Sequence, residues 1–555
     1  MKMLTRAAYE TLLFVSLAMA HDNDGSTDID TTMNMDMHAS SIIATPTAPV
    51  SRNGQDPGPT SYFSYGGYSS PILAHIVLMI IGWCFILPSA VLLSTGRSRL
   101  ALPLHFLFLV INALGLLFGI VYNSQTPDLY EYNAHHKIGW IVSCVMTAQV
   151  VLALIFVYNC RGESKQSQWR SFNGFAFLPV ATDGQQYHSS GESSQGVESS
   201  SSIRSPSRSD SESQAEYDGF ENPEKLHSLC HWLSISVVDR FLIKRMSGIA
   251  SDSVLRFSNN LYDVVDRIIL PFGFIAIVTG AVTYGGIFKG DEIFNGLAHF
   301  IKGGIFFWYG ILTLGRFIGA WADLGWAWNK KPPASVVGWK AKVPSGEFVE
   351  SFVIWLYGVV NHVSISIMFF GGGLVGMLFE SHRIRDMLGN TLLRLRPLSC
   401  ESYDESWQPP NSQSISLNPM PALIIMLLGT MMGSHHQDSM TSTMVHKQWG
   451  NMLMGFAIAR GMTYVLLFLR PSTSYLPARP PTEIVASFCL ISGGLIFMLS
   501  ARQVIEAMEF YELDAMFTFT VGMGFTAFIM SLVVLNIAIK AWALKHEGEE
   551  NRQLS

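Results

Sequence analysis

Long apolar runs alternate with short polar segments over most of the chain. Each run approaches the roughly 20 residues of helix that are needed to cross the hydrocarbon core of a bilayer. Because backbone polar groups in lipid have to be bonded within the segment, these runs predict α-helices. The expected spans are 72–93, 101–122, 138–158, 268–287, 298–320, 352–378, 420–432, 452–469, 484–501 and 515–539. The pattern therefore predicts an all-α, polytopic transmembrane helical bundle with nine or ten spans.

The polar segments between the runs suggest how the chain is organised. Residues 1–20 have a weakly basic start, the apolar core LLFVSLA and a small-residue end at Ala18-Met19-Ala20, which is typical of a signal peptide. An uncleaved anchor is the alternative. The stretch GESSQGVESSSSIRSPSRSDSESQ has little to bury and predicts a disordered linker. The expected divisions are a signal peptide (1–20), a flexible arm (21–70), a three-span block (71–160), a cytoplasmic linker (161–225), a multi-span C-terminal domain (226–545) and a tail (546–555).

Basic residues in the short loops predict the orientation of the spans. With the mature N-terminus outside, the Lys and Arg residues after the first, third and fifth spans all face the cytoplasm. The segment SHRIRDMLGNTLLRLR, which holds four arginines, would then face outside, against the rule. Since 420–432 is short for a full crossing, we expect a re-entrant hairpin or a partial span there.

Composition excludes several function classes. The 555 residues are 49% hydrophobic and 14% charged, with a formal net charge of -6. This is typical of an integral membrane protein in contact with the lipid bilayer, and no dense basic run predicts nucleic-acid binding. The six cysteines form no CxxC pair, and the GxSxG, GxxxxGK[ST] and HExxH motifs are absent from the sequence. A soluble enzyme is therefore not expected.

Histidines at the ends of the first three spans are candidate cofactor ligands. His75 and His136 are expected at one depth on the outer side, and His105 near the inner face. Two histidines on facing helices at the same depth can hold a haem iron axially. The alternative is that each histidine is an ordinary interfacial side chain.

The stretches SPILAHIVLMIIGW, RLALPLHFLFLV and NAHHKIGWIV resemble the cytochrome b561-like N-terminal region of a fungal Ytp-type family of multi-spanning membrane proteins. The stretches WYGILTLGRFIGAWADLGWAWN, FVIWLYGVVNHV and MVHKQWGN resemble that family's C-terminal region. The likeness to cytochromes b561 implies transmembrane electron transfer through two b haems, each held by two histidines. His75, His105 and His136 match in position and type, so the chain departs from the four-ligand pattern.

A second candidate site is the polar stretch GTMMGSHHQDSMTSTMVHKQWG at 429–450. With the helix continuing past Met432, the side chains of Met432, His436, Met440 and Met444 would share one face. Thioether and imidazole groups suit copper as Cu(I). The candidate metal ligands are His435, His436, Met440, Met444 and His446. The alternative, which the sequence favours, is a plain turn between two spans.

Charged residues within or beside the apolar runs suggest a third function. Lys302, Arg316 and Arg460 fall in apolar runs, where an ionised group usually pairs or lines a wet path. Arg502 and Glu506 are spaced to pair along one helix. A transporter would use such residues for a substrate or a proton, and the alternative is a purely structural pairing. The glycines at 371–373 favour helix packing.

Three hypotheses follow for a protein of the secretory-pathway membranes. The first is a haem- or metal-dependent transmembrane oxidoreductase with an unidentified electron donor. The second is a transporter or copper-handling carrier with an unidentified substrate. The third is a membrane scaffold without a cofactor.

Overall fold

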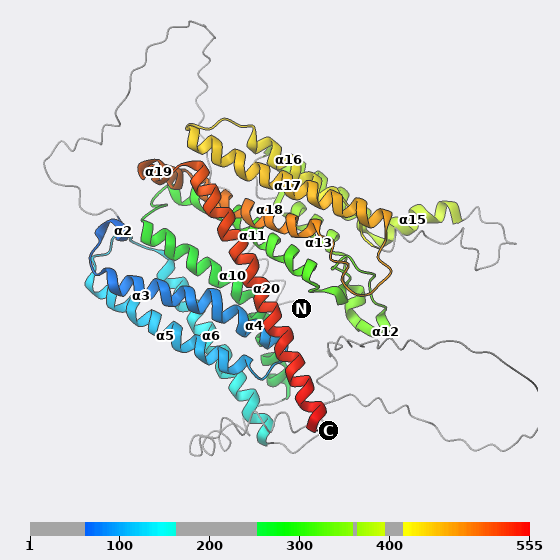
Figure 1. The fold of residues 1–555 in the computed structure, drawn as a ribbon, viewed down its shortest axis with the longest axis horizontal. Coiled ribbons are helices and arrows are strands. Elements are labelled where there is room, and N and C mark those ends of the chain that lie inside the picture. Colours follow the sequence, from blue (N-terminus) through cyan, green and yellow to red (C-terminus); the bar gives the residue numbers. More distant parts are fainter. Residues whose placement is uncertain (1–60, 163–251, 359–362, 394–414, 555) are drawn as a thin grey trace, which may run out of the picture. The chain divides into compact units, whose positions relative to one another are not determined.

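The computed structural model describes residues 61–162, 252–358, 363–393 and 415–554, which form helices and, within these ranges, no strands (Figure 1). The predicted signal peptide, the predicted arm up to residue 60 and the predicted linker from residue 163 lie outside the described residues. The chain divides into two compact units, residues 1–145 with 266–555, and residues 146–265. In the second unit the described residues are the end of one long helix and the start of the next.

Among the described residues, eight helices are long and apolar enough to cross a membrane, which confirms the predicted all-α, multi-spanning fold class with fewer long spans than the nine or ten expected. They cover Ser69–Thr95, Ala101–Gln125, Ala134–Leu154, Asn260–Gly285, Glu292–Ile318, Met440–Leu469, Thr482–Leu499 and Ala515–Glu549. The full elements are α2 (Tyr62–Tyr65), α3 (Ser69–Ile80), η1 (Ile81–Ile86), α4 (Leu87–Thr95), α5 (Ala101–Gln125), α6 (Ala134–Gly162), α10 (Asp252–Gly285), α11 (Glu292–Ile318), η2 (Ala322–Leu324), α12 (Ala334–Val337), η3 (Gly338–Lys342), α13 (Gly346–Gly358), α14 (Val363–Glu380), α15 (His382–Leu393), α16 (Met420–Gly433), α17 (Met440–Leu469), α18 (Thr482–Leu499), α19 (Arg502–Phe510) and α20 (Ala515–Leu554).

The predicted single span over 352–378 is wrong, because two helices occupy this region. A β-carbon at Gly358, the end of α13, would meet Phe370 of α14, and one at Gly373 of α14 would meet Ser351 of α13. These contacts run antiparallel, and Ser345 before α13 donates a hydrogen bond to Glu380 at the end of α14, 2.6 Å away. Helices α13 and α14 therefore form a hairpin that begins and ends on the same side of the helical bundle. Hydropathy does not detect this reversal, since both arms are apolar.

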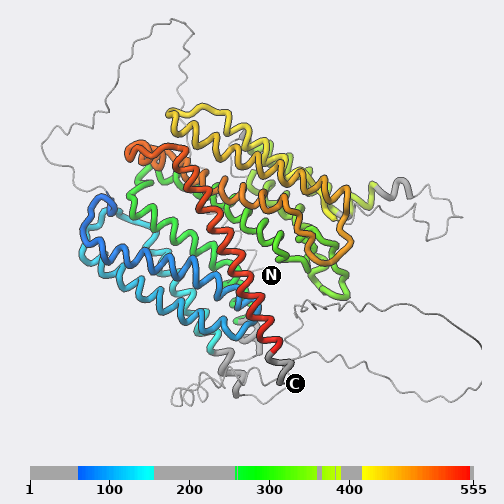
Figure 2. The backbone as a smooth tube through the Cα atoms, in the orientation of Figure 1, coloured from blue at the N-terminus to red at the C-terminus, as the bar shows by residue number. Residues whose placement is uncertain are grey.

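The expected re-entrant segment is therefore at 346–380, not at 420–432. Helix α16 instead pairs with α17, and the two run side by side (Figure 2). A β-carbon at Gly429 of α16 would lie 2.7 Å from the carbonyl oxygen of Gly450 in α17. Glycine at both positions lets the two backbones touch.

Loop contacts assign the helix ends to two sides. On one side, Lys330 N–H donates to Ser474 O at 2.9 Å and Arg479 donates to Ile318 O at 3.2 Å. On the other side, Tyr130 Oη–H donates to the carbonyl of Ile287 at 2.9 Å. With the hairpin on the first side, the arginines at 383 and 385 share that side with the lysines at 330 and 331. The positive-inside pattern is thereby restored, and we refer to the first side as the inner side.

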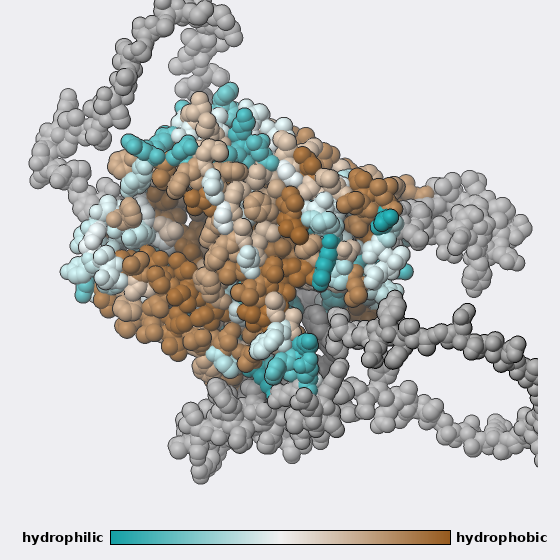
Figure 3. Space-filling model, in the orientation of Figure 1, coloured by the Kyte–Doolittle hydropathy of each residue, from teal (hydrophilic) through white to brown (hydrophobic). Residues whose placement is uncertain are grey.

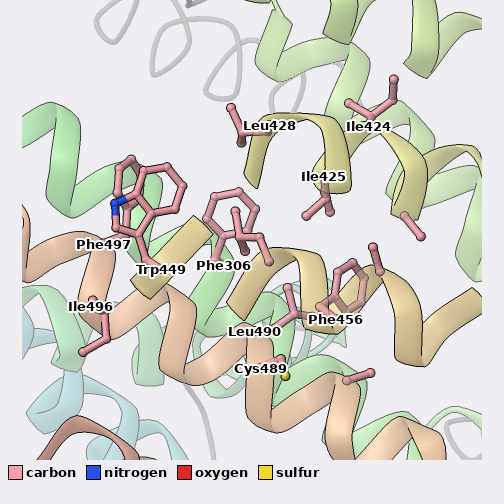
Figure 4. Packing of buried hydrophobic residues seen from close by; sticks show 14 of the residues in the cluster. Phe306, Ile424, Ile425, Leu428, Trp449, Phe456, Cys489, Leu490, Ile496 and Phe497 are labelled. Carbon is pink, nitrogen blue, oxygen red and sulfur yellow. The ribbon is translucent and has the colours of Figure 1, made fainter. Parts of the chain in front are cut away.

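Buried aromatic and aliphatic side chains form the core of the C-terminal helices. Figure 4 shows Phe306 of α11, Trp449 of α17 and Phe497 of α18 in this cluster, beside isoleucines and a leucine of α16. The rings of Trp449 and Phe497 lie 4.3 Å apart, centroid to centroid. Elsewhere large apolar side chains face outward, and Figure 3 shows them gathered where Figure 1 draws α3 and α5. This surface suits lipid contact.

Candidate functional site

Two imidazoles face one another between the N-terminal helices. The ring centroids of His75 on α3 and His135 on α6 lie 6.2 Å apart, with the ring planes at 80°. A β-carbon at Gly119 of α5 would lie 2.9 Å from His75 Nδ1, and one at Gly280 of α10 would lie 2.9 Å from His135 Cε1. Four helices thus meet at this pair, and two of them pack against the rings through glycines.

Backbone carbonyls fix the protonation of both rings. His75 Nδ1 lies 2.8 Å from Gly115 O, and His135 Nδ1 lies 3.0 Å from Ala276 O. A carbonyl oxygen accepts but cannot donate, so each Nδ1 carries the hydrogen. In the neutral imidazole the lone pair is then on Nε2, as in histidines that bind metals and donate their other N–H to a carbonyl.

The predicted partner His136 does not face His75, because its side chain is exposed on the outer side. It lines a surface pocket of about 300 Å³ together with Asp128, Asn133 and Lys137. Helix α6 begins at Ala134, so His135 and His136 point about 100° apart around its axis. The sequence predicted a histidine at this depth, but not which of the two adjacent residues points inward.

His105 lies in a separate place in the same bundle. It is buried on α5, where Nδ1 lies 2.8 Å from Ala101 O and Nε2 has no hydrogen-bond partner among the described residues. Three further histidines, His227, His231 and His362, lie outside the described residues. His105 therefore has its Nδ1 hydrogen-bonded to a carbonyl and its Nε2 available, as a metal ligand would. No second imidazole among the described residues is shown to lie beside it.

A polar relay holds this bundle together. Trp83 Nε1–H in η1 donates to Asn112 of α5 at 3.1 Å, and the Asn112 amide donates to Ser143 of α6 at 3.1 Å. The six residues of η1 form a π-helical turn within the first span. Such turns often lie at functional sites. The relay fixes the helices that carry His75 and His135.

The predicted stripe of Met432, His436, Met440 and Met444 does not form on one helix. Helix α16 ends at Gly433, and α17 begins at Met440 after Ser439, whose side chain accepts a hydrogen bond from Ser442 N at 3.1 Å. Glycine ends one helix and a serine cap starts the next. The structure thus has the inter-helix turn that the sequence favoured.

The five candidate metal ligands of this turn separate into two groups. His435, His436, Met440 and Met444 are exposed, whereas His446 is buried beside Trp449 with Nδ1 2.9 Å from Ser442 O. Within the described residues, no group of three or more His, Cys, Asp or Glu side chains is arranged to hold a metal ion.

Five buried charges form a cluster near the inner ends of the C-terminal helices. Arg316 of α11 donates to Glu347 at 2.8 Å and to Glu350 at 2.6 Å, both on α13. Arg460 of α17 lies 3.3 Å from Glu350 and 2.8 Å from Glu483 at the start of α18. All five side chains are at most 8% exposed. The cluster ties four helices together.

An aromatic loop covers this cluster. Arg316 lies 4.3 Å and Arg460 5.4 Å from the ring centroid of the buried Trp328, and Arg316 Nε–H donates to Trp326 O at 2.6 Å. The neighbouring Asn329 donates to Tyr475 O at 2.7 Å, which anchors the loop to the 470–481 segment. In the same loop, burial lowers the pKa of Lys331, whose ammonium donates to Val343 O at 2.6 Å.

The sequence singled out the two arginines of the cluster but missed its three glutamates. Glu347 and Glu350 are three residues apart at the start of an apolar run, and Glu483 also opens one. An acidic residue at the start of a helix is usually interpreted as an exposed residue that stabilises the helix N-terminus. The burial of these three glutamates is therefore visible only in the folded structure. Lys302, the third predicted charge, lines a cavity of about 30 Å³ with Phe306 and Trp449. The predicted Arg502–Glu506 pair is confirmed at 3.1 Å on α19.

Two family models match separate parts of the chain. Residues 272–362 and 360–541 match the family described as "Protein YTP1-like, C-terminal", and residues 57–159 match a "Domain of unknown function (DUF2427)". No solved structure matches the chain.

Two yeast relatives cover nearly the whole chain. "Uncharacterized membrane protein C3B8.06" of Schizosaccharomyces pombe is 31% identical over 533 residues, which are 89% of this chain and 98% of the relative. "Uncharacterized membrane protein YCR061W" of Saccharomyces cerevisiae is 28% identical over 560 residues, 88% of this chain and 85% of the relative. With its eight apolar helices, the chain therefore belongs to the Ytp-type family of fungal integral membrane proteins.

Proposed function

We propose that the protein transfers electrons within the membrane through a b-type haem held by His75 and His135. The observation that carries this proposal is the pair of facing imidazoles, each with Nδ1 bonded to a backbone carbonyl. His75 and His135, whose ring centroids lie 6.2 Å apart, would hold the iron of such a haem through their Nε2 atoms.

The surroundings of the pair also support this function. Gly119 and Gly280 let α5 and α10 pack directly against the rings, since a β-carbon at either position would lie 2.9 Å from a ring atom. The carbonyls of Gly115 and Ala276 orient the two imidazoles and increase their basicity. A bound haem supplies one-electron redox chemistry, which none of the side chains here provides.

The two adjacent histidines of α6 allow a matched test. We expect the purified protein to show a Soret band and bound iron, and His75→Ala and His135→Ala to lose both. His136→Ala should keep both, because its exposed side chain does not contact His75. His135→Met, which keeps a ligand of similar bulk, should shift the spectrum rather than abolish it. A band that survives His135→Ala, or disappears in His136→Ala, would overturn the proposal.

Copper handling is the second candidate, favoured by the exposure of four Met and His side chains around one outer turn. Copper bound to the purified protein should then fall when His436, Met440 and Met444 are replaced together. Replacement of the buried His446 serves as the comparison, since its Nδ1 is already bonded to Ser442 O. Copper content unaffected by the triple replacement would exclude this turn as the binding site.

A further inference from the structure

The charged cluster of the C-terminal helices is not neutral when all its groups are ionised. Two guanidinium groups, Arg316 and Arg460, face three carboxylates, Glu347, Glu350 and Glu483. One net negative charge would remain in a buried site within apolar helices. An uncompensated buried charge is costly, so such a group usually becomes neutral or binds a counter-ion.

The three carboxylates differ in their hydrogen bonds. Glu347 accepts from Arg316 Nη2, and Glu350 accepts from Arg316 Nη1 and from Arg460 Nη1. Glu483 is fully buried, and neither of its oxygens has a hydrogen-bond partner among the described residues. Arg460 Nε lies 2.8 Å from Glu483 Oε1 but is not aligned to donate to it. Glu483 therefore has no hydrogen bond as well aligned as those of Glu347 and Glu350, and its nearest charged neighbour is Arg460.

Three other buried side chains beside the arginines of the cluster have polar atoms without hydrogen-bond partners. The hydroxyls of Tyr309 and Tyr464 and the indole N–H of Trp328 have no hydrogen-bond partner within the described residues. The titratable and charged groups of the helices packed around Glu483 are Tyr309 and Arg316 of α11, Glu347 and Glu350 of α13, and Arg460 and Tyr464 of α17. The next carboxylate, Glu380 of α14, accepts from Ser345. The cluster thus combines one carboxylate in excess of its arginines with several buried polar atoms that have no hydrogen-bond partner among the described residues.

We propose that this cluster is a proton-binding site and that Glu483 carries the proton at neutral pH. A metal cation fits less well, because it needs several oxygen ligands and every carboxylate here already lies against a guanidinium group. A proton needs no cavity, and binding it makes the cluster neutral. The site lies at the inner ends of α11, α17 and α18, under the loop of Trp328.

Infrared spectroscopy on the full-length protein in lipid nanodiscs tests this assignment directly. The carbonyl stretch of a protonated carboxyl group should be present at neutral pH and absent from Glu483→Gln. The matched control is Glu506→Gln, because Glu506 is exposed and paired with Arg502, and this variant should keep the band. Glu350→Gln should also lose the band, since two carboxylates then balance two arginines and Glu483 ionises.

Thermal unfolding separates a proton site from a purely structural ion pair. Glutamine copies the shape of a neutral glutamate, so Glu483→Gln should melt no lower than Glu506→Gln. An ionised Glu483 would instead make Glu483→Gln clearly less stable, because Arg460 would lose a counter-charge. The proposal is overturned if the wild-type protein shows no such band at neutral pH, if Glu483→Gln keeps it, or if the band appears only when sodium and potassium ions are removed.

Discussion

Arg316 and Arg502 both form ion pairs, but the two pairs should contribute differently to stability because one is buried and the other is exposed. Arg316 is buried and donates to two glutamates and to Trp326 O, whereas the Arg502–Glu506 pair is 66% and 58% exposed. Water screens the exposed pair and competes for its hydrogen bonds. The planar guanidinium of Arg316 bonds in three directions, which a lysine cannot copy.

We expect Arg316→Lys to lower the free energy of unfolding by about 3 kcal/mol, the scale of breaking a buried ion pair. The same substitution at Arg502 should cost less than about 0.5 kcal/mol. Thermal unfolding in one detergent measures both. Equal effects of the two substitutions would mean that the buried cluster contributes no more than a surface pair.

Glycines decide how closely the helices of this protein approach one another. A β-carbon at Gly303 of α11 would lie 2.6 Å from Gly494 O in α18, so these two backbones also touch. The glycines at 371–373 of α14 differ in their surroundings, so a substitution should have a different effect at each of them. Gly373 lies against Trp355 and Ser351 of α13, while Gly371 has nothing within 4 Å of its would-be β-carbon.

Gly373→Ala should therefore destabilise the protein by about 1–3 kcal/mol, because the added methyl group overpacks the α13–α14 contact. Gly371→Ala should leave stability unchanged or raise it slightly, since alanine is the better helix former. The melting temperatures of the two variants in the same detergent test this difference. The α13–α14 hairpin is not as described if Gly373→Ala melts like the wild type.

The hairpin of α13 and α14 determines the topology of the whole chain. Because it returns to the side on which it starts, α15 lies on the same side as α12. The described residues have eight helices that are long and apolar enough to cross a membrane, against the nine or ten spans predicted from hydropathy, and α16 is a shorter apolar helix. A crossing by α16 would make nine.

Single cysteines in a cysteine-free background test this topology. Ser335→Cys on α12 and Asp386→Cys on α15 should react with an impermeant thiol reagent from the same side of sealed vesicles. Ser434→Cys, in the turn after α16, should react from the opposite side. Labelling of Asp386→Cys together with Ser434→Cys would show that 346–380 crosses the membrane once, as the hydropathy alone suggested.

The amino-acid sequence by itself determined the class of the protein, because hydrocarbon-length apolar runs require helices in lipid whatever their neighbours are. It also determined the depth of the first-block histidines and, through Gly433 and Ser439, the break between α16 and α17. Tertiary structure decided which residues meet. Helix rotation selected His135 over His136, antiparallel packing turned one apolar run into a hairpin, and folding buried Glu347, Glu350 and Glu483 against Arg316 and Arg460. These choices depend on contacts between segments far apart in the chain, which a local pattern does not contain.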